Sequence, residues 1–432
     1  MATLTRLIVR SSLSLLLLLL GAAPVAGVLA AAQTAPPESV GISAERLHRI
    51  DELVQRNIDA GEISGAVTLV ARNGQIVHLA AHGVMDVASK KPMQPDTVFR
   101  IASMSKPVAA VAIMMLMEEG KVRLSDPISK FIPSYADAEV AIEKPRAAGA
   151  PPAPATAGPA AAAPPQFYTV PAARPITVLD VLTHTSGVMS GALSNSVGNP
   201  SFQKRHEVGL KWVEPVGDAP LEFQPGSRWS YSAVAGFDVL SRIVEVASGQ
   251  SFDQFLAQRI FQPLGMQDAT FWPSTAQRAR LVTAYQRRDG ALVPNQDPDS
   301  MSGQKYFSGA GGIMATAESY AQFGMMLANG GALNGKRLLS PRTIELMGSA
   351  FIPDTLPGRQ PGEGYGLGVR VITSSAARGT WLSAGSFGWS GAYGTHFWVD
   401  PSKKLVAVLM AQTPNRQLQA DFENAVMQSV VD

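Results

Sequence analysis

The stretch FRIASMSKPVAAVAIMMLMEEGK, Phe99 to Lys121, decides the fold of this chain. Residues 108 to 117 carry no polar side chain, and a helix that is apolar on every side belongs in a protein core. Ser103 is of a type that caps helices, and Gly120 of a type that ends them. The sequence therefore predicts a central buried helix with Ser103 at its N-terminus.

Ser103 and Lys106 stand three residues apart, a spacing that puts both side chains on one face of a helix. A serine hydroxyl is a weak nucleophile until a neighbouring base takes its proton. Lysine can be that base, because burial disfavours its charged form. Backbone N–H groups at the helix start can also stabilise an oxyanion. This segment therefore offers a nucleophile, a base and one oxyanion donor.

The Ser-x-x-Lys pattern is not specific by itself. It recurs at Ser201 to Lys204 and at Ser302 to Lys305, where no apolar helix follows, and we interpret both copies as loop residues. Ser103 also has a purely structural interpretation, as a helix cap followed by a lysine whose stem packs on the core. Without further motifs, both interpretations of Ser103 stay open.

The composition is that of an ordinary globular protein, with 46% hydrophobic and 16% charged residues. Of 36 Lys and Arg residues, Arg6 and Arg10 lie in an N-terminal leader, and the remaining 34 equal the 34 Asp and Glu residues. This balance indicates no nucleic-acid partner. The absence of cysteine excludes disulfides and a thiol nucleophile.

Residues 1 to 32 have the layout of a secretory signal peptide, with two arginines, a leucine run at residues 15 to 20 and a small-residue end. The uncharged residues 11 to 37 also allow an uncleaved membrane anchor. The small-residue end favours cleavage. We therefore expect a periplasmic or secreted protein, residues 33 to 432, with no stable membrane span.

The remaining chain shows β structure at both ends and helices in the middle. An amphipathic helix from Ser43 and a hairpin around Asn73-Gly74 come first. Strand-like runs return late and a last helix follows, at residues 366 to 373, 390 to 399, 405 to 411 and about 417 to 430. The two ends are therefore predicted to share one antiparallel sheet.

The predicted fold class is α/β of the α+β type, an antiparallel sheet flanked by N- and C-terminal helices, with a helical lobe. The sheet lobe would comprise about residues 39 to 98 and 300 to 432, and the helical lobe about residues 99 to 299. Residues 147 to 165, almost all Ala, Pro and Gly, are predicted to be a mobile surface insertion. The active site is expected in the cleft between the lobes.

Two other patterns have weaker implications. His184, in the turn-rich stretch Thr183 to Gly187, is the best histidine candidate for a Ser-His pair. The chain has no G-x-S-x-G, however, so an α/β-hydrolase would lack its nucleophile elbow. The glycine cluster Gly309 to Gly312 does not have the G-x-G-x-x-G spacing, and we expect no nucleotide loop there.

Three short motifs stand out in chain order: Ser103-Met104-Ser105-Lys106, Tyr231-Ser232-Ala233 and Trp389-Ser390-Gly391, the last at the opening of a predicted strand. Together they resemble the motifs S-x-x-K, Y-x-N and K/H/W-x-G of the serine β-lactamase superfamily. Within it, the chain is most similar to class C β-lactamases, DD-peptidases and family VIII carboxylesterases. The resemblance extends from about residue 39 to the C-terminus and implies a β-lactamase/DD-peptidase-like fold.

The resemblance also implies roles for single residues. Ser103 would be the acylated nucleophile and Lys106 its base. Tyr231 would protonate the leaving group and help to activate the deacylating water. The oxyanion hole would use the backbone N–H groups of Ser103 and Ala392. The third motif, Trp389-Ser390-Gly391, would line the substrate site.

Two departures from the family pattern bear on the substrate. Ala233 replaces an asparagine that in relatives bonds the lysine and the substrate. Trp389 replaces a lysine or histidine that would meet a carboxylate. Without that cation, recognition of a carboxylate lacks a charge-assisted hydrogen bond of about 1.5 to 3 kcal/mol. Both changes favour uncharged esters. Arg416 is a possible alternative carboxylate anchor, and its other interpretation is a solvated arginine at a helix start.

We therefore expect a secreted serine hydrolase that cleaves carboxylic esters through a Ser103 acyl-enzyme, without metal or cofactor, and with weak activity on β-lactams. Its partner would be a small-molecule ester or β-lactam-like substrate. One alternative is a true β-lactamase or D-alanyl-D-alanine carboxypeptidase. Another, of a different class, is a non-catalytic binding module associated with peptidoglycan.

Overall fold

The computed structural model of the protein describes residues 34–144, 166–296, 298–299, 301–353 and 355–432. Residues 34 to 432 form one compact unit. The predicted signal peptide, residues 1 to 32, and the predicted surface insertion, residues 147 to 165, lie outside the described residues. In the described part, every helix is too short or too polar to cross a membrane.

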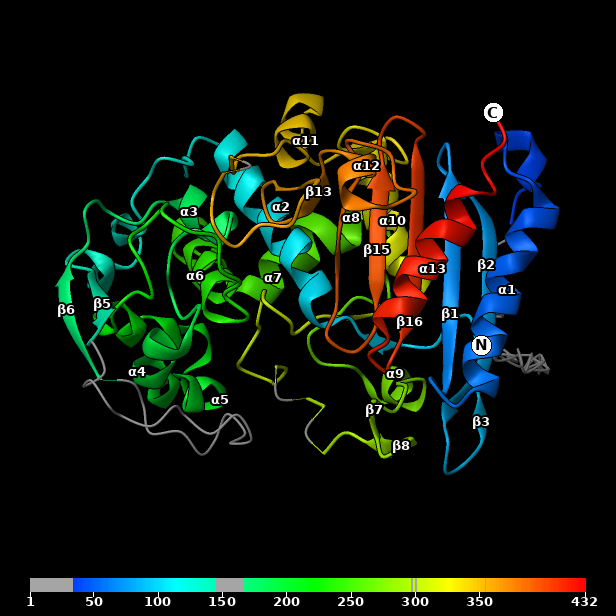
Figure 1. The fold of residues 1–432 in the computed structure, drawn as a ribbon, viewed down its shortest axis with the longest axis horizontal. Helices are drawn as coiled ribbons and strands as arrows, with labels where there is room; N and C mark the ends of the chain where they lie inside the picture. Colours follow the sequence, from blue (N-terminus) through cyan, green and yellow to red (C-terminus); the bar gives the residue numbers. More distant parts are fainter. Residues whose placement is uncertain (1–33, 145–165, 297, 300, 354) are drawn as a thin grey trace, which may run out of the picture. The chain divides into compact units, whose positions relative to one another are not determined.

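An antiparallel sheet of eight strands forms the centre of the fold, in the order β12-β13-β14-β15-β16-β1-β2-β3 (Figure 1). β1 pairs with β16 from Ala66 opposite Ala411 to Arg72 opposite Leu405, so strands from both ends of the chain meet in the sheet. The predicted antiparallel sheet is therefore confirmed. Its strands are β1 Gly65–Arg72, β2 Gln75–Asp86, β3 Lys91–Pro92, β12 Glu363–Tyr365, β13 Arg370–Ile372, β14 Phe387–Ser390, β15 His396–Asp400 and β16 Leu405–Ala411.

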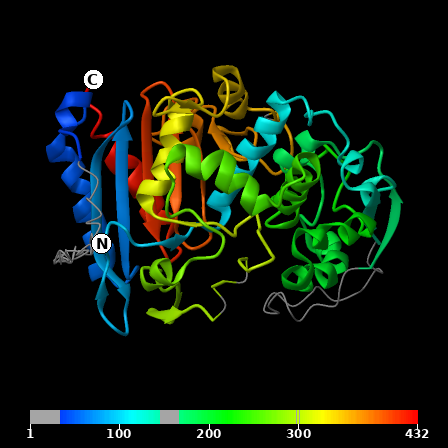
Figure 2. The ribbon, with the colours of Figure 1, turned by 180° about the vertical axis from the view of Figure 1, so that it is seen from behind.

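Helices cover both faces of the sheet. Side chains alternate between the two faces along each strand, so one strand contributes residues to both apolar clusters. Leu405 and Ala407 of β16 pack in one apolar cluster with α1 (Ala44–Asp59) and α13 (Arg416–Met427). Val406, the residue between them, packs in the other cluster with α10 (Ala317–Ala328). Figure 1 shows α13 in front of the sheet, and Figure 2, from behind, shows α10 on the opposite face.

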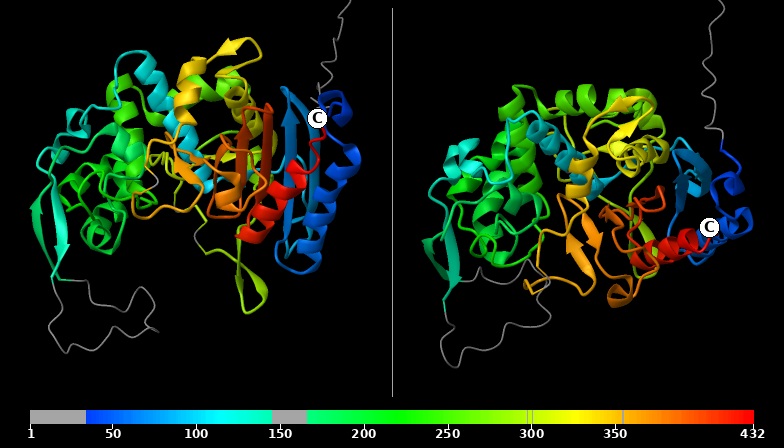
Figure 3. Two further views of the ribbon diagram at one scale, coloured as in Figure 1. Left: turned by 45° about the horizontal axis from the view of Figure 1, so that its top comes forward. Right: turned by 90° about the horizontal axis from the view of Figure 1, so that it is seen from above.

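The predicted central helix is α2 (Ser105–Glu118), in which every residue from Ser105 to Leu116 is buried. It packs against α6 (Ala235–Ser248), whose end is marked by Gly249 in the left-handed conformation. Figure 3 shows α2, in cyan, between the green helical region and the sheet. The apolar stretch of the sequence thus joins the sheet to the helical region.

Shorter elements complete the described structure. The other helices are α3 Val178–Leu182, α4 Ala192–Gln203, α5 Arg205–Val208, α7 Phe252–Leu256, α8 Gln262–Leu264, α9 Thr275–Ala279, α11 Pro341–Met347 and α12 Ser375–Arg378. The 3-10 and π turns are η1 Pro37–Val40, η2 Ala102–Met104, η3 Ile128–Lys130, η4 Pro133–Tyr135, η5 Gly209–Val213, η6 Pro215–Asp218 and η7 Ala257–Phe261. Two-stranded sheets pair β4 Phe99–Arg100 with β9 Met314–Ala315, β5 Glu139–Glu143 with β6 Phe167–Pro171, β7 Tyr285–Arg288 with β8 Ala291–Pro294, and β10 Ala332–Leu333 with β11 Lys336–Arg337.

The predicted helix cap at Ser103 is wrong. Ser103 lies in the 3-10 turn η2, and α2 begins at Ser105 without a side-chain cap. The reason is local, because Ala102 has φ 45° and turns the chain in the left-handed region just before Ser103. A non-glycine residue in this region costs free energy and persists only where its surroundings hold it. The Ser103 hydroxyl is consequently free to face other side chains.

The predicted strand at residues 390 to 399 is also wrong, because two strands share this stretch. β14 ends at Ser390 and β15 begins at His396. Between them the Gly394 N–H donates to the Gly391 carbonyl at 3.0 Å, and Gly394 has φ 100°. The third motif therefore closes a strand rather than opening one.

Candidate active site

Ser103 and the third motif line one cavity of about 770 Å³. The cavity walls come from η2, the segment before α6, the strands β12 to β15 and the start of α13. Tyr231, Trp389, Gly391 and Ala392 are among its lining residues. The structure thus brings residues from all three sequence motifs to one place.

Lys106 is fully buried, and its Nζ has three oxygen partners. It lies 3.1 Å from Ser103 Oγ, 2.8 Å from the Ala233 carbonyl and 2.8 Å from the Ala310 carbonyl. A carbonyl oxygen can only accept hydrogen bonds. In the neutral amine, the two carbonyls therefore occupy both N–H groups and leave the nitrogen lone pair for the Ser103 proton. The surrounding backbone thus holds the Lys106 amine against the Ser103 hydroxyl.

Asp238 positions the segment that contains Ser308 and Ala310 through buried hydrogen bonds. Its Oδ1 accepts hydrogen bonds from the Ala310 N–H at 3.3 Å and from Ser308 Oγ at 2.6 Å, and its Oδ2 accepts one from Trp212 Nε1 at 3.0 Å. Burial raises the pKa of Asp238, and these hydrogen bonds oppose the increase. The glycine cluster around Ala310 therefore supplies a carbonyl that accepts a hydrogen bond from Lys106. Sequence reasoning missed this role. A charged residue among the apolar residues of α6 was the available signal.

Tyr231 donates a hydrogen bond from its hydroxyl to Ser103 Oγ at 2.8 Å. Burial alone would raise the pKa of Tyr231, but the positive charge of Lys106 and the hydrogen bond with Ser103 outweigh it and lower this pKa. Lys106 Nζ lies 5.0 Å from the centre of the Tyr231 ring. Ser103 is therefore contacted by an amine, which can take its proton when neutral, and by a phenol, which can do so only when ionised.

The third motif is pinned beside Ser103. Thr395 Oγ1 donates to the Ile101 carbonyl at 3.1 Å, and a β-carbon at Gly391 would overlap both of these oxygen atoms. In the described residues, the backbone N–H groups of Ser103 and Ala392 have no protein acceptor, and both residues line the cavity. These N–H groups are available to an oxyanion.

His184 is buried among aromatic rings and does not hydrogen-bond to Ser103. Its Nδ1 accepts the Ser232 N–H at 3.2 Å. Burial and the charge of Lys106 hold the pKa of His184 well below its ordinary value, so the ring is neutral. The ring centres around His184 are those of Tyr231 at 4.8 Å, Tyr365 at 5.1 Å, Phe237 at 5.3 Å, Trp229 at 6.1 Å and Trp389 at 6.4 Å. This geometry does not support a catalytic pair of Ser103 and His184.

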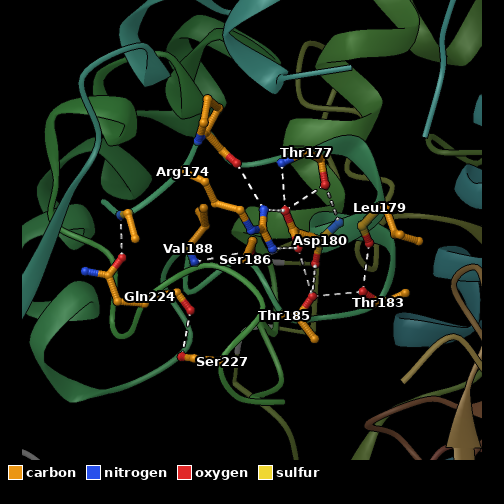
Figure 4. Close-up of polar contacts among 12 residues, drawn as sticks. Arg174, Thr177, Leu179, Asp180, Thr183, Thr185, Ser186, Val188, Gln224 and Ser227 are labelled. Atoms are coloured by element: carbon orange, nitrogen blue, oxygen red, sulfur yellow. Dashed lines mark hydrogen bonds and ion pairs between the residues drawn. The ribbon is translucent and has the colours of Figure 1, made fainter. Parts of the chain in front are cut away.

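The buried Asp180 carboxylate accepts a hydrogen bond from Thr185 Oγ1 at 3.3 Å, in the loop that carries His184 (Figure 4). Asp180 binds both terminal nitrogens of Arg174, at 2.7 and 2.8 Å, and forms a capping box with Thr177 at the start of α3. The Ser230 N–H in turn donates to the His184 carbonyl at 3.0 Å. The Asp180 cluster thereby positions the segment that leads to Tyr231.

The far wall of the cavity is polar. Ser390 Oγ lies 2.8 Å from His396 Nδ1, and His396 Nε2 lies 3.0 Å from Glu423 Oε1. Sequence reasoning placed Ser390 in the site but missed His396 and Glu423. Arg416 lies at the start of α13, is exposed and lines the same cavity. Its side chain has no hydrogen bond or ion pair with any described residue.

A family profile described as Beta-lactamase matches residues 50–431. The chain belongs to this Beta-lactamase family. The family assignment confirms the resemblance to the serine β-lactamase superfamily. The structure of simvastatin synthase (LovD) from Aspergillus terreus matches the fold with a TM-score of 0.73 at 21% identity, over 89% of this chain and 98% of that one.

Several proteins that are similar to this chain in sequence have names that describe hydrolases. Protein Rv1367c of Mycobacterium tuberculosis is 33% identical over 371 residues, 82% of this chain and 87% of the relative. Esterase EstB of Burkholderia gladioli is 28% identical over 84% of this chain and 90% of its own. A putative D-alanyl-D-alanine carboxypeptidase of Escherichia coli is 26% identical over 88% and 85%. The protein is a serine hydrolase with the β-lactamase fold, and the interpretation as a non-catalytic binding module is not retained.

Proposed function

We propose that this serine hydrolase cleaves uncharged carboxylic esters through an acyl-enzyme on Ser103. The observation that carries the proposal is the aromatic wall beside Ser103. Trp389 stands in the third-motif position, with its ring centre 5.7 Å from that of Tyr231 and 5.3 Å from that of Tyr365. Such a wall favours apolar groups of a substrate, and it offers no charge-assisted hydrogen bond to a carboxylate.

In the proposed acylation, Ser103 Oγ attacks the ester carbonyl carbon while its proton passes to the neutral amine of Lys106 or to the phenolate of Tyr231. The carbonyl oxygen becomes an oxyanion, which accepts hydrogen bonds from the N–H groups of Ser103 and Ala392. The bond to the alcohol oxygen then breaks, and Tyr231 returns the proton to that oxygen. A water molecule then gives a proton to the same base and attacks the acyl carbonyl carbon. The bond to Ser103 Oγ breaks, the proton passes to that oxygen, and the carboxylic acid is released.

A second candidate function is β-lactam or D-alanyl peptide hydrolysis, and a specific observation favours it. Arg416 lines the cavity without a partner among the described residues and can meet a substrate carboxylate. We propose slow β-lactam hydrolysis as a side activity of the same site. The variant Arg416→Ala should then reduce kcat/KM for a cephalosporin more than that for a neutral ester.

The deciding experiment compares kcat/KM for a short-chain nitrophenyl ester with that for a cephalosporin. The proposal expects a clear preference for the ester, and a preference for the cephalosporin would reverse the substrate assignment. Intact mass after treatment with an acylating inhibitor should show one adduct on the protein and none on the variant Ser103→Ala. An adduct that persists in this variant would place the nucleophile elsewhere.

We further propose that the protein is exported, since residues 1 to 32 have the pattern of a signal peptide. Expression in a Gram-negative host followed by cell fractionation tests this. The mature protein should appear in the periplasm or medium, with an N-terminus near residue 33. A full-length protein in the cytoplasmic fraction would contradict export.

A further inference from the structure

His184 contacts the segment that carries Tyr231 through both its main chain and its ring. Its carbonyl oxygen accepts the Ser230 N–H at 3.0 Å, and its Nδ1 accepts the Ser232 N–H at 3.2 Å. Its ring centre lies 4.8 Å from that of Tyr231, the residue between these two serines. A single residue therefore holds the second motif on both sides of the phenol.

Tyr231 needs such contacts because no regular secondary structure fixes its position. Residues 228 to 232 belong to no helix or strand, and α6 begins only at Ala235. The Tyr231 hydroxyl nevertheless lies 2.8 Å from Ser103 Oγ. A displacement of about 1 Å in a reacting group can lower a rate by about 10²-fold. The hydrogen bonds of the neighbouring residues therefore bear directly on the reaction.

The backbone of His184 is strained. It has φ 57°, in the left-handed region that few residues other than glycine adopt. Such a conformation costs free energy, persists only where the surrounding structure holds it, and is frequent at functional sites. At His184 it accompanies two hydrogen bonds to the same segment, one to the carbonyl and one to the ring. The strained backbone and the contacts to the second motif therefore coincide in one residue.

Buried hydrogen bonds hold the loop on both sides of His184. The hydroxyl groups of Thr183 and Thr185, its two neighbours in the chain, lie 3.0 Å apart (Figure 4). The Thr185 N–H donates to the Asp180 carbonyl at 2.8 Å, and the Gly226 N–H donates to the Thr185 carbonyl at 2.8 Å. Thr183, His184 and Thr185 are all buried. The loop therefore gives His184 a fixed place from which to position another segment.

The His184 ring serves as an acceptor and not as a base. Burial and the charge of Lys106 hold the pKa of His184 well below its ordinary value, so the ring is neutral. A neutral imidazole has one acceptor nitrogen and one N–H. Because Nδ1 accepts the Ser232 N–H, the ring hydrogen lies on Nε2. His184 therefore has no free lone pair with which to take a proton from a reacting group.

We propose that His184 is a positioning residue for Tyr231, whose carbonyl and Nδ1 place the phenol hydroxyl against Ser103. Of the described residues, His184 is not one that lines the cavity around Ser103, so it acts on the reaction through the second motif. The inference rests on the proposed esterase function, because it concerns the step in which Tyr231 takes part. Loss of the Nδ1 acceptor should lower kcat and change KM much less.

Two amide variants of His184 test the proposal with a short-chain nitrophenyl ester. The side-chain oxygen of asparagine can lie close to the position of Nδ1, and asparagine tolerates the left-handed backbone. Glutamine carries the same amide one methylene further out, where its oxygen is displaced from that position. We expect kcat, per mole of Ser103 that an inhibitor acylates, to be about tenfold to hundredfold lower in His184→Gln than in His184→Asn. Equal kcat values in the two variants would overturn the proposal.

A double-mutant cycle separates positioning from a general structural effect. If His184 acts through the phenol, His184→Gln should lower kcat much less in Tyr231→Phe than in the parent protein, because the hydroxyl that it positions is already absent. An equal fold loss in both backgrounds would show that His184 acts independently of Tyr231. The control His48→Gln makes the same change at an exposed histidine of α1 and should leave kcat unchanged.

Two further outcomes are distinguishable. If His184→Gln does not fold, His184→Phe takes its place in the cycle, since it keeps an aromatic ring and lacks the Nδ1 acceptor. If the parent protein does not hydrolyse the ester, the proposed esterase function itself fails. The variants are then compared by the rate at which a fluorophosphonate labels Ser103, measured by intact mass. Slower labelling in His184→Gln than in His184→Asn would support the positioning role, and equal rates would overturn it.

Discussion

The carbonyl oxygen of Ala233 accepts a hydrogen bond from Lys106 Nζ at 2.8 Å. In the family pattern this position of the second motif is an asparagine, whose side chain bonds the lysine. Here the main chain makes the contact, so the side chain can be lost without leaving the amine unpartnered. The replacement therefore leaves a hydrogen bond to Lys106 in place.

Lys106→Ala should reduce acylation by about 10²-fold to 10⁴-fold, because it removes a general base from Ser103. Stopped-flow measurement of nitrophenol release gives the acylation rate. The matched control is Lys204→Ala, which changes the exposed lysine of another Ser-x-x-Lys copy and should leave the rate unchanged. Equal rates for Lys106→Ala and the control would exclude Lys106 as the base.

Tyr231→Phe should lower kcat by about 10²-fold to 10⁴-fold, because it removes an acid–base group and keeps the ring. The pKa of Tyr231 is lowered by Lys106 and Ser103 against the effect of burial. Activity that depends on the phenolate should therefore rise with pH through an apparent pKa below 10, and the variant should lose this rise. A pH profile of kcat/KM checks it, with the exposed Tyr168→Phe as control.

Trp389→Lys should restore a cation to the third motif and favour anionic substrates. We expect the ratio of kcat/KM for a cephalosporin to that for a neutral ester to rise by about tenfold or more, the effect of a charge-assisted hydrogen bond. Steady-state assays on both substrates measure it. Trp381→Lys adds the same charge at a tryptophan that is 64% exposed and should not change the ratio. The same increase in both variants would mean that net charge, and not the third motif, is responsible.

Asp238→Ala should destabilise the protein by about 1 to 3 kcal/mol, because it leaves buried donors without an acceptor. It should also lower kcat, since the Ala310 carbonyl that holds Lys106 loses its support. Urea unfolding and ester hydrolysis measure the two effects. The exposed Asp137→Ala is the control. Unchanged stability in Asp238→Ala would show that this carboxylate is not needed by its partners.

Glu423→Gln should make the stability of the protein less dependent on pH. The folded-state pKa of Glu423 is about 2, below its ordinary value of 4.5. Such a group stabilises the fold above its unfolded pKa, and the contribution is lost as the pH falls towards the folded value. The variant should therefore lose stability at neutral pH and show a shallower decrease between about pH 5 and about pH 2. Urea unfolding across this range measures it, and a slope equal to that of the parent protein would contradict it.

Much of the fold could be predicted because its signals are local. The apolar stretch of α2, the Asn73-Gly74 turn and the spacing of Ser103 and Lys106 all lie within a few residues of the features they determine. The start of α2 could not be predicted, since the left-handed backbone of Ala102 is held by its surroundings. Similarly, alternating apolar residues did not reveal the turn at Gly391 that separates β14 from β15.

The parts of the site that escaped prediction depend on contacts between distant segments. His396 and Glu423 belong to different elements, and neither stands in a recognisable motif. Asp238 and Ala310 are likewise joined only in the folded chain. Family motifs could name the groups around Ser103, but they carry no information about which backbone carbonyls orient the lysine.

The pairing of β1 with β16 has a consequence for biosynthesis. β1, which ends at Arg72, pairs with β16, which begins at Leu405. The ribosome has therefore made most of the polypeptide before these two strands can form hydrogen bonds. Contacts between such remote segments slow folding. We therefore expect the nascent chain to expose the apolar edge of its first hairpin for much of its synthesis, a state that is prone to aggregation.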